Sequence, residues 1–187
     1  MNIKRTIVAL SFVCIGIGSI NAQKTDKPMK TLVAYYSYSG NTRTVAQQIQ
    51  KATGADIFEI EVKNAYPSDY QALLDRAKKE INNNGKPVLK SMPKDLAQYD
   101  VIFVGSPNWW STIAPPVATF LSNGNFSGKT IVPFVTHGGG GMAQCETNAK
   151  KLCPQAKMLK GLAINGSAVQ SATPRVEKWL REIGIIK

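Results

Sequence analysis

The sequence predicts an α/β fold: a three-layer α/β/α sandwich around a five-stranded parallel sheet, doubly wound so that helices cover both faces. The main observation is an alternation of buried-strand and helix patterns that repeats five times along the chain. The second is a length of 187 residues with 43% hydrophobic residues, which suits one domain and excludes a disordered chain. Right-handed crossovers between parallel strands follow from the alternation.

The first two strand patterns flank the first helix pattern. Residues 31–36 (TLVAYY) are apolar on both faces, as expected of a strand in the middle of a sheet. Apolar residues then recur at helical spacing from Val45 to Ala52, and Gly54 stops the pattern. Residues 57–62 alternate, with apolar side chains on one side and glutamates on the other, which indicates a strand near the sheet edge.

The clearest helix pattern lies in the middle of the chain. Ser68 and Gln71 have the spacing of a capping box, and an Asn-Gly stretch ends the helix. Its apolar stripe consists of Tyr70, Leu73, Leu74, Ala77 and Ile81. A buried strand at residues 101–104 (VIFV) and a helix around residues 117–121 follow.

Two strands and two helices are predicted in the last third of the chain. Residues 130–135 (TIVPFV) form a strand pattern, although a proline at position 133 cannot donate a ladder hydrogen bond. Residues 142–152 and 174–183 have helix patterns, and residues 158–164 between them have a strand pattern. Thr173 is expected to cap the last helix, with a proline at its first position.

The N-terminus has the pattern of a secretory signal. Lys4 and Arg5 precede an almost wholly apolar run at residues 6–20, and Ala22 is a small residue suited to cleavage after it. The run is shorter than the roughly 20 residues that span a bilayer. An uncleaved membrane anchor and a lipoprotein site at Cys14 remain as alternatives.

The chain is therefore divided into a signal peptide at residues 1–22, a flexible leader at 23–30 and one folded domain at 31–187. The mature protein is expected to be exported, either periplasmic or secreted, with no transmembrane span. Its oligomeric state cannot be derived from the sequence.

Charge and metal-binding residues limit the classes of partner. The formal net charge is +11, but the basic residues are spread along the chain and are not interleaved with aromatic residues. Nucleic acid is therefore not an expected partner, whereas an anionic membrane surface or an acidic partner is the alternative to simple solvation of the charge. Because His137 is the single histidine, no metal site is expected.

Cys145 and Cys153 are a candidate disulfide pair. Along a continuous helix their Cα atoms would lie about 12 Å apart, too far for a bridge. A bridge would require the helix to end early, as the following proline at position 154 allows. The sequence leaves this pairing open.

Ligands of doubly wound sheets bind beyond the carboxyl ends of the strands, so three loops form the candidate site. The first is residues 37–42 (SYSGNT), which places hydroxyl groups, an amide and backbone N–H groups at a helix N-terminus suited to a phosphate. Gly40 lets the backbone turn close to a ligand. The alternative is an ordinary strand-to-helix turn rich in capping residues.

The other two loops suit a flat aromatic ring. Residues 106–112 (SPNWWST) contain adjacent tryptophans that cannot both face the core, and indole rings beside a phosphate site can border a planar ligand. Residues 136–141 (THGGGG) expose backbone groups that can bond to the polar edge of such a ring. A mobile turn is the simpler interpretation of the glycines. A proton-relay role for His137 is the alternative to its filling the turn.

Together these loops resemble those of the flavodoxin-like FMN proteins, in particular a branch whose middle loop carries a Trp-Trp pair. The similar stretches are YYSYSGNTRTVA, VGSPNWWSTIAPPV and THGGGG. The resemblance implies the strand order 2-1-3-4-5 and FMN as cofactor. It also implies three sets of FMN contacts: Ser37, Ser39, Gly40, Asn41 and Thr42 at the phosphate; Pro107, Asn108, Trp109 and Trp110 at the isoalloxazine ring; Thr136, His137, Gly138, Gly139 and Gly140 at its pyrimidine edge.

The leading functional hypothesis is an exported FMN-binding redox protein that transfers electrons between a donor and a partner or substrate. No catalytic side chain is required, because the flavin carries the redox chemistry. One alternative is a self-contained FMN-dependent NAD(P)H or quinone oxidoreductase, with Trp109 and Trp110 forming a wall of the substrate site. Another is a flavin-free module that binds an anion or a protein partner. Positive charge and export both depart from the acidic electron-carrying flavodoxins.

Two further motifs are rejected. Residues 138–143 fit the G-x-G-x-x-A dinucleotide pattern, but they follow the fourth strand and no acidic residue lies near position 160. Residues 128–130 (GKT) resemble the end of a P-loop, but position 123 is Asn123 and the motif leads into a strand.

Overall fold

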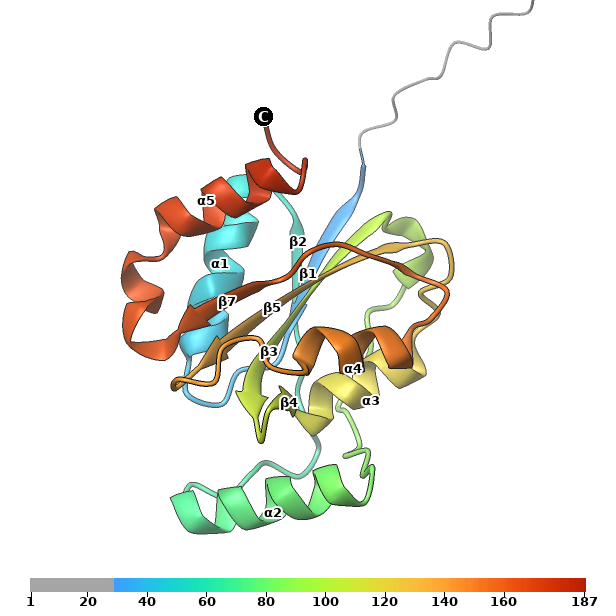
Figure 1. Ribbon diagram of the computed structural model, residues 1–187. Coiled ribbons are helices and arrows are strands. Elements are labelled where there is room, and N and C mark those ends of the chain that lie inside the picture. Colours follow the sequence, from blue (N-terminus) through green and yellow to red (C-terminus); the bar gives the residue numbers. More distant parts are fainter. Residues whose placement is uncertain (1–28) are drawn as a thin grey trace, which may run out of the picture.

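A parallel sheet with helices on both faces forms the body of the protein (Figure 1). The computed structural model describes residues 29–187, so the predicted signal peptide and residues 23–28 of the predicted leader lie outside the described residues. At Lys30 the backbone N–H donates to Asp100 Oδ2 at 2.9 Å, and the carbonyl accepts from the Asp100 N–H at 2.8 Å. The folded domain therefore includes the last residue of the predicted leader.

The sheet has the strand order β2-β1-β3-β5-β6, and β7 pairs with the second half of β5. These strands are β2 (Asp56–Glu59), β1 (Thr31–Tyr35), β3 (Val101–Trp109), β5 (Thr130–His137), β6 (Lys157–Met158) and β7 (Leu162–Asn165), and their pairings are parallel. The predicted architecture and the order 2-1-3-4-5 are confirmed. The predicted strand at 158–164 is split into β6 and β7.

All the helices except α2 (Tyr70–Asn82) lie in pairs on the two faces of the sheet (Figure 1). The paired helices are α1 (Asn41–Thr53), α3 (Pro115–Asn123), α4 (Cys145–Leu152) and α5 (Thr173–Glu182), and short 3-10 segments lie at Leu96–Gln98 and Gly166–Ser171. Helices α1 and α5 cover one face, and α3 and α4 cover the other. Among these helices none is long and apolar enough to cross a bilayer.

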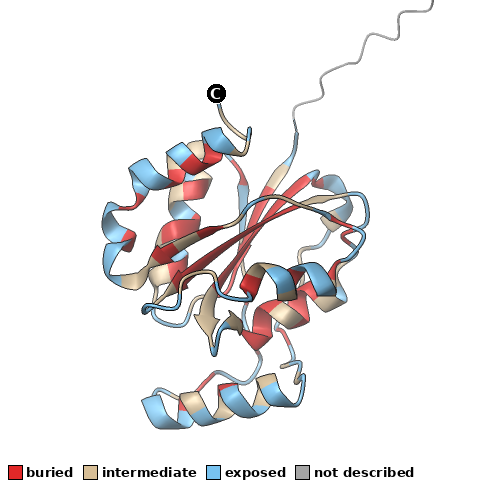
Figure 2. Cartoon of the chain, in the orientation of Figure 1, coloured by how far each residue is buried: buried red, intermediate tan, exposed pale blue. Residues whose placement is uncertain are grey.

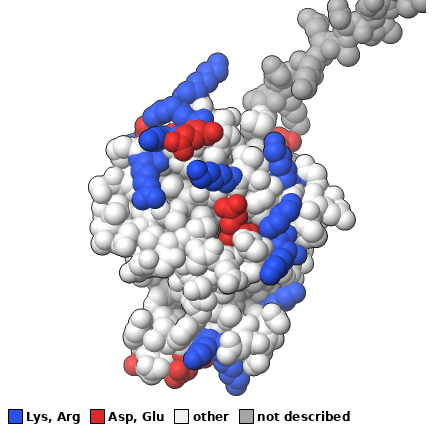
Figure 3. All heavy atoms as spheres, in the orientation of Figure 1, with Lys and Arg blue, Asp and Glu red and all other residues white. Residues whose placement is uncertain are grey.

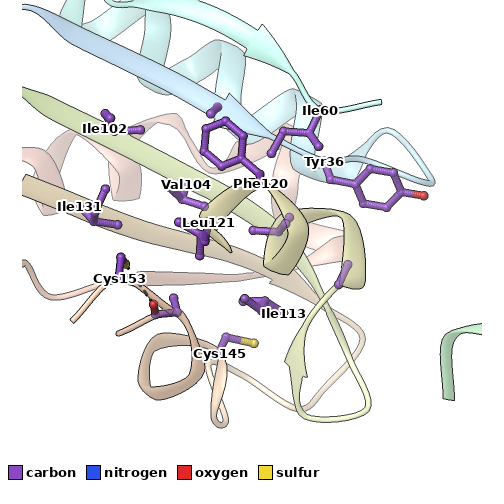
Figure 4. Packing of buried hydrophobic residues seen from close by; sticks show 14 of the residues in the cluster. Tyr36, Ile60, Ile102, Val104, Ile113, Phe120, Leu121, Ile131, Cys145 and Cys153 are labelled. Carbon is purple, nitrogen blue, oxygen red and sulfur yellow. Dashed lines mark hydrogen bonds between the residues drawn. The ribbon is translucent and has the colours of Figure 1, made fainter. Parts of the chain in front are cut away.

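Two hydrophobic cores fill the space between the sheet and its helices (Figure 2). Alternate residues of one strand serve opposite cores: Ile102 points toward α3 and α4, and Phe103 toward α1 and α5. Figure 4 shows the first core, where Phe120 of α3 lies near Ile102 and Leu121 near Ile131. This arrangement explains why the central strands are apolar on both faces.

The edge strand is shorter than predicted but keeps its alternation. Strand β2 ends at Glu59, before the predicted limit of residue 62. Ile60 and Val62 are nevertheless 1% and 7% exposed, and Glu61 is exposed. Val62 forms an isolated antiparallel bridge with Leu89, so this stretch leaves the sheet without losing its buried face.

Helix α2 stands apart from the body and packs less completely than its pattern predicts (Figure 1). Only Leu73 and Ala77 of the predicted stripe are buried, and Tyr70 is 70% exposed. The predicted capping box is wrong, because Asp69 is the N-cap and its Oδ1 accepts the Ala72 N–H at 2.8 Å. A carboxylate at the N-cap also interacts favourably with the helix dipole, which a serine one position earlier does not provide.

The predicted loop at residues 106–112 is largely a β-hairpin. Strand β3 continues to Trp109, well past the predicted end at 104, and pairs with the antiparallel strand β4 (Thr112–Ile113). Trp110 and Ser111 form the turn, with φ angles of 51° and 64°. Such left-handed angles cost non-glycine residues about 1–3 kcal/mol each, so the flanking strand pair must hold the turn.

Pro133 occupies a central strand because its missing N–H faces a gap. The Thr130 N–H donates to Asp100 on the β3 side, and the Ile131 carbonyl accepts from Leu159 on the β6 side. Alternate residues face alternate neighbours, so Pro133 faces the β6–β7 side. Strand β6 ends at Met158 and β7 begins at Leu162, so no strand residue pairs with Pro133 on this side and no ladder carbonyl loses its N–H donor.

Two helix starts differ from prediction by one to three residues. Helix α4 begins at Cys145, three residues after the predicted start at 142. The N-cap of α5 is Ala172, and Thr173 is already helical, so the predicted threonine cap is wrong.

Both C-terminal-half cysteines are buried free thiols. Cys145 is fully buried, and Cys153 Sγ donates to the Ala149 carbonyl at 3.0 Å in the last turn of α4. Burial raises the pKa of the Cys145 thiol from 9.0 to about 12. Burial also raises the pKa of Cys153, while nearby Lys150 lowers it.

We expect the Cys145 thiol to resist alkylation by iodoacetamide at pH 8.5 in the folded protein and to react rapidly in urea. The folded-state pKa lies above the unfolded value, so this group favours folding below about pH 9 and its contribution is lost as the pH rises toward 12. Mass spectrometry of the peptides measures modification at each cysteine. Equal labelling rates with and without urea would contradict the burial of Cys145.

Candidate functional site

The three predicted loops leave the same edge of the sheet. Parallel register places Tyr35 of β1 beside Gly105 of β3, and Gly105 beside Phe134 of β5. The chain therefore continues from these neighbouring strands at one edge (Figure 1). A Cβ on Gly105 would lie 2.2 Å from the Phe134 ring, so the glycine is required by packing beneath the site.

The first loop ends in unsatisfied backbone donors. Gly40, with φ of 90°, is the N-cap of α1 and supplies no side-chain cap. The Arg43 N–H donates to Ser37 Oγ at 3.2 Å, whereas the N–H groups of Asn41 and Thr42 have no acceptor among the residues that the structure describes. A helix N-terminus with free donors favours an anion. A Cβ on Gly40 would contact nothing, so its backbone angle explains the glycine.

A buried hydrogen bond joins the first loop to the third. Thr42 Oγ1 and Thr136 Oγ1 lie 2.8 Å apart, and these residues are 1% and 4% exposed. Residues 94 positions apart are thereby held together beneath the loops.

The two adjacent tryptophans lie in different environments. Trp109 is half-buried among three tyrosine rings, with ring-centre distances of 5.7 Å to Tyr36, 6.1 Å to Tyr38 and 5.0 Å to Tyr66. Trp110 is 49% exposed at the hairpin turn. The expectation that both indoles cannot face the core is confirmed.

Contacts with the segment before α2 hold this aromatic cluster in place. The Tyr38 hydroxyl donates to the Pro67 carbonyl at 2.7 Å, and Lys78 Nζ of α2 lies 4.9 Å from the centre of the Trp110 ring. Burial raises the pKa of the Tyr36 and Tyr66 hydroxyls far above 10, so both stay neutral. The cluster beside the first loop therefore consists of aromatic rings that meet Trp109 edge to face, and the hydroxyls of Tyr36 and Tyr66 in it are neutral.

The glycine loop is held at both ends. His137 Nδ1 accepts the Gly139 N–H at 3.1 Å, and Asn108 Nδ2 donates to the Gly141 carbonyl at 2.8 Å. His137 thus shapes its own turn, and the bond from Asn108 ties the second loop to the third. Pro107 pairs in register with Thr136 of β5.

Gly138 is a glycine that the fold does not explain. Its φ is not positive, and a Cβ built on it would have no atom within 4 Å. Gly139 has a φ of 153°, and a Cβ on Gly140 would lie 3.3 Å from Asn108 Nδ2. The open space above Gly138 allows close approach of a ligand.

Sequence reasoning missed a fourth loop, after β7. A Cβ on Gly166 would lie 2.6 Å from Asn41 Nδ2 and 3.7 Å from the His137 carbonyl, so this backbone closes the site beside the first and third loops. The missed signal was the Asn165-Gly166 pair directly after a strand. Tyr36 and Tyr66 were also missed, because a buried aromatic residue does not differ from a core residue in sequence.

The site contains few charged groups. Of the predicted contact residues only His137 is titratable. Within residues 29–187, no group of three or more His, Cys, Asp or Glu side chains converges as a metal site would require. The groups that these loops offer to a ligand are therefore mainly backbone N–H groups, hydroxyl groups and aromatic faces.

Comparison with known proteins agrees with this geometry. Residues 30–183 match the sequence profile of the flavodoxin family. The chain belongs to the flavodoxin family. A crystal structure of a candidate flavoprotein from Bacteroides uniformis is 30% identical, with a TM-score of 0.74 over 82% of this chain and 98% of that one.

Two other solved structures of this flavodoxin type are similar. A candidate flavoprotein from Bacteroides eggerthii is 31% identical, with a TM-score of 0.70 over 82% of this chain and 97% of that one. A flavoprotein from Lactobacillus acidophilus, crystallised in complex with FMN, is 26% identical, with a TM-score of 0.65 over 76% of this chain and 97% of that one.

We expect Thr136→Val to lower the free energy of unfolding by about 1–3 kcal/mol, because the Thr42 hydroxyl is left buried without its partner. The double variant Thr42→Val with Thr136→Val should lose less than the sum of the single variants, since no orphaned hydroxyl remains. Urea denaturation of the flavin-free protein measures both. Strict additivity would show that the two hydroxyls do not interact.

Proposed function

We propose that this flavodoxin-family protein is an exported FMN-binding redox protein that passes electrons between a donor and a partner or substrate. The proposal rests on one observation: three features meet at the same edge of the sheet. They are the free N–H donors of α1, the aromatic cluster around Trp109 and the open glycine loop. A nucleotide with an anionic tail and a flat ring has this combination of chemistry. The FMN in the similar protein from Lactobacillus acidophilus supports the choice of flavin.

The residues present fit FMN at the phosphate end. Asn41 and Thr42 offer backbone N–H groups, and Ser39 is exposed beside them. Ser37 Oγ accepts the Arg43 N–H, so its hydroxyl proton remains available to a phosphate oxygen. The phosphate-binding set in this proposal is Ser37, Ser39, Gly40, Asn41 and Thr42.

The residues also fit the ring end. Pro107, Asn108, Trp109 and Trp110 lie on the hairpin that borders the first loop, and Thr136, His137, Gly138, Gly139 and Gly140 lie on the loop tied to it by Asn108. FMN supplies reversible electron transfer when bound, while the protein supplies position and environment. Neutral tyrosines and indole rings give that environment an aromatic, largely apolar side.

Export is proposed from the sequence of residues 4–22 alone, and electron transfer from the chemistry of flavin. Acidic electron-carrying flavodoxins suit partners with a basic surface. The net charge of this chain is +11, which instead favours a partner with an acidic surface.

Flavin titration of the purified protein tests the proposed function. We expect bound flavin to be released as FMN, and FMN to bind about a hundredfold more tightly than riboflavin, because two or more charge-assisted hydrogen bonds to phosphate are lost with riboflavin. Quenching of flavin fluorescence measures both dissociation constants. Equal affinities, or no flavin binding, would overturn the proposal.

We expect Gly138→Ala to weaken FMN binding about tenfold while leaving the urea midpoint unchanged, since the added methyl group enters space open to the ligand and meets no protein atom. Gly161→Ala is the matched control: its Cβ would lie 2.6 Å from Met142 and 2.9 Å from the Pro133 carbonyl, so stability should fall instead. Unchanged FMN affinity in Gly138→Ala would remove the third loop from the site.

A further inference from the structure

A separate groove lies between the end of α2, strand β4 and the helices α3 and α4. Its volume is about 570 Å³, which falls within the roughly 300–1,000 Å³ of small-molecule sites. None of the predicted FMN contacts lines it. The groove is therefore a second concave surface that the proposed function leaves unused.

The groove has an apolar wall built from four elements. Ile81 of α2, Ile113 of β4, Pro115 and Ala118 of α3, and Leu152 of α4 line it. Ile113 and Pro115 are buried residues of the body, so this wall belongs to the folded core. Such a surface suits a hydrocarbon or aromatic body.

The Glu80 carboxylate and the Asn148 amide in the groove already have partners, whereas the Asn84 side chain is exposed. Glu80 accepts from Arg76 Nε at 2.9 Å and from the Tyr66 hydroxyl, which occupies both of its oxygens. Asn148 Nδ2 donates to Thr112 Oγ1 at 2.8 Å. These groups therefore add little unsatisfied polarity, and the Glu80 charge is balanced by Arg76.

Two lysines give the groove its net charge. Lys86 on the segment after α2 and Lys151 on α4 both line the groove, and both are exposed. Within residues 29–187 neither forms an ion pair or a side-chain hydrogen bond. Basic side chains also outnumber acidic ones along the right-hand edge of the view in Figure 3.

From this charge complementarity we infer that the groove is a binding site for an anionic amphiphile, a small carboxylate with an apolar body. The apolar body packs on Ile113, Ala118 and Leu152, and the carboxylate lies between the Lys86 and Lys151 ammonium groups. The site is independent of FMN in its residues. The two sites are connected through the β3–β4 hairpin, which supplies Trp109 to the aromatic cluster and Thr112 to the groove, and through α2, whose Glu80 lines the groove and accepts the Tyr66 hydroxyl.

Calorimetric titration with decanoate tests this inference, on protein saturated with FMN so that the flavin site is filled. We expect one decanoate per chain, and binding about tenfold weaker in the double variant Lys86→Gln with Lys151→Gln. The matched control, Lys94→Gln with Lys157→Gln, removes the same charge from exposed lysines outside the groove and should bind as the wild type does. Decan-1-ol tests the need for the anion and should bind more weakly than decanoate.

Amide NMR spectra recorded during the titration locate the ligand. Shifts confined to the surroundings of Ile81, Ile113 and Ala118 would support the groove. The inference would be overturned by any of four results. These are no decanoate binding, the same loss of decanoate affinity in both double variants, equal affinities for decan-1-ol and decanoate, or shifts centred on residues 136–141. A protein that binds no flavin is titrated without FMN, so failure of the flavin proposal and failure of this one remain distinguishable.

Discussion

Parallel register between the central strands is the constraint on which the rest of this molecule depends. Because β1, β3 and β5 run in the same direction with Tyr35, Gly105 and Phe134 side by side, the segments that follow them meet at one edge. The absence of a side chain at Gly105 lets the Phe134 ring pack against this level of the sheet. Loops that lie far apart in the chain thus become neighbours because the strands that carry them are adjacent.

Specific bonds between loops then convert this proximity into a defined surface. The buried Thr42–Thr136 pair joins the first and third loops, and Asn108 joins the hairpin to the glycine loop. Each bond uses polar groups that would otherwise be costly to bury. The α1 donors and the space over Gly138 remain outside these bonds, and they are the features through which we propose that FMN is recognised.

Helix α2 extends the body into an arm that shapes two concave surfaces. Arg76 of α2 lies 4.1 Å from the centre of the Tyr66 ring and pairs with Glu80 of the same helix. These contacts hold α2 against the segment that precedes it. On one side the arm supports the aromatic cluster around Trp109. On the other, with the β4 strand, it borders the groove between Lys86 and Lys151. The low burial of α2 follows from this position, since only part of its circumference faces the body.

Local patterns in the sequence were sufficient to predict much of the fold and most of the candidate site. Apolar runs and helical spacing were enough to predict the parallel α/β architecture and the helices, whereas the strand order came from the resemblance to the flavodoxin-like proteins. A hydroxyl-rich turn, paired indoles and a glycine run identified three of the four candidate site loops. These features follow from backbone preferences and burial periodicity, which act over a few residues. Only the tertiary structure decided the extension of β3 into a hairpin, the tyrosines around Trp109, the Gly166 contact with Asn41, and the gap that accommodates Pro133. Each of these depends on which segments pack side by side, and contacts between distant residues leave no periodic trace in a single sequence.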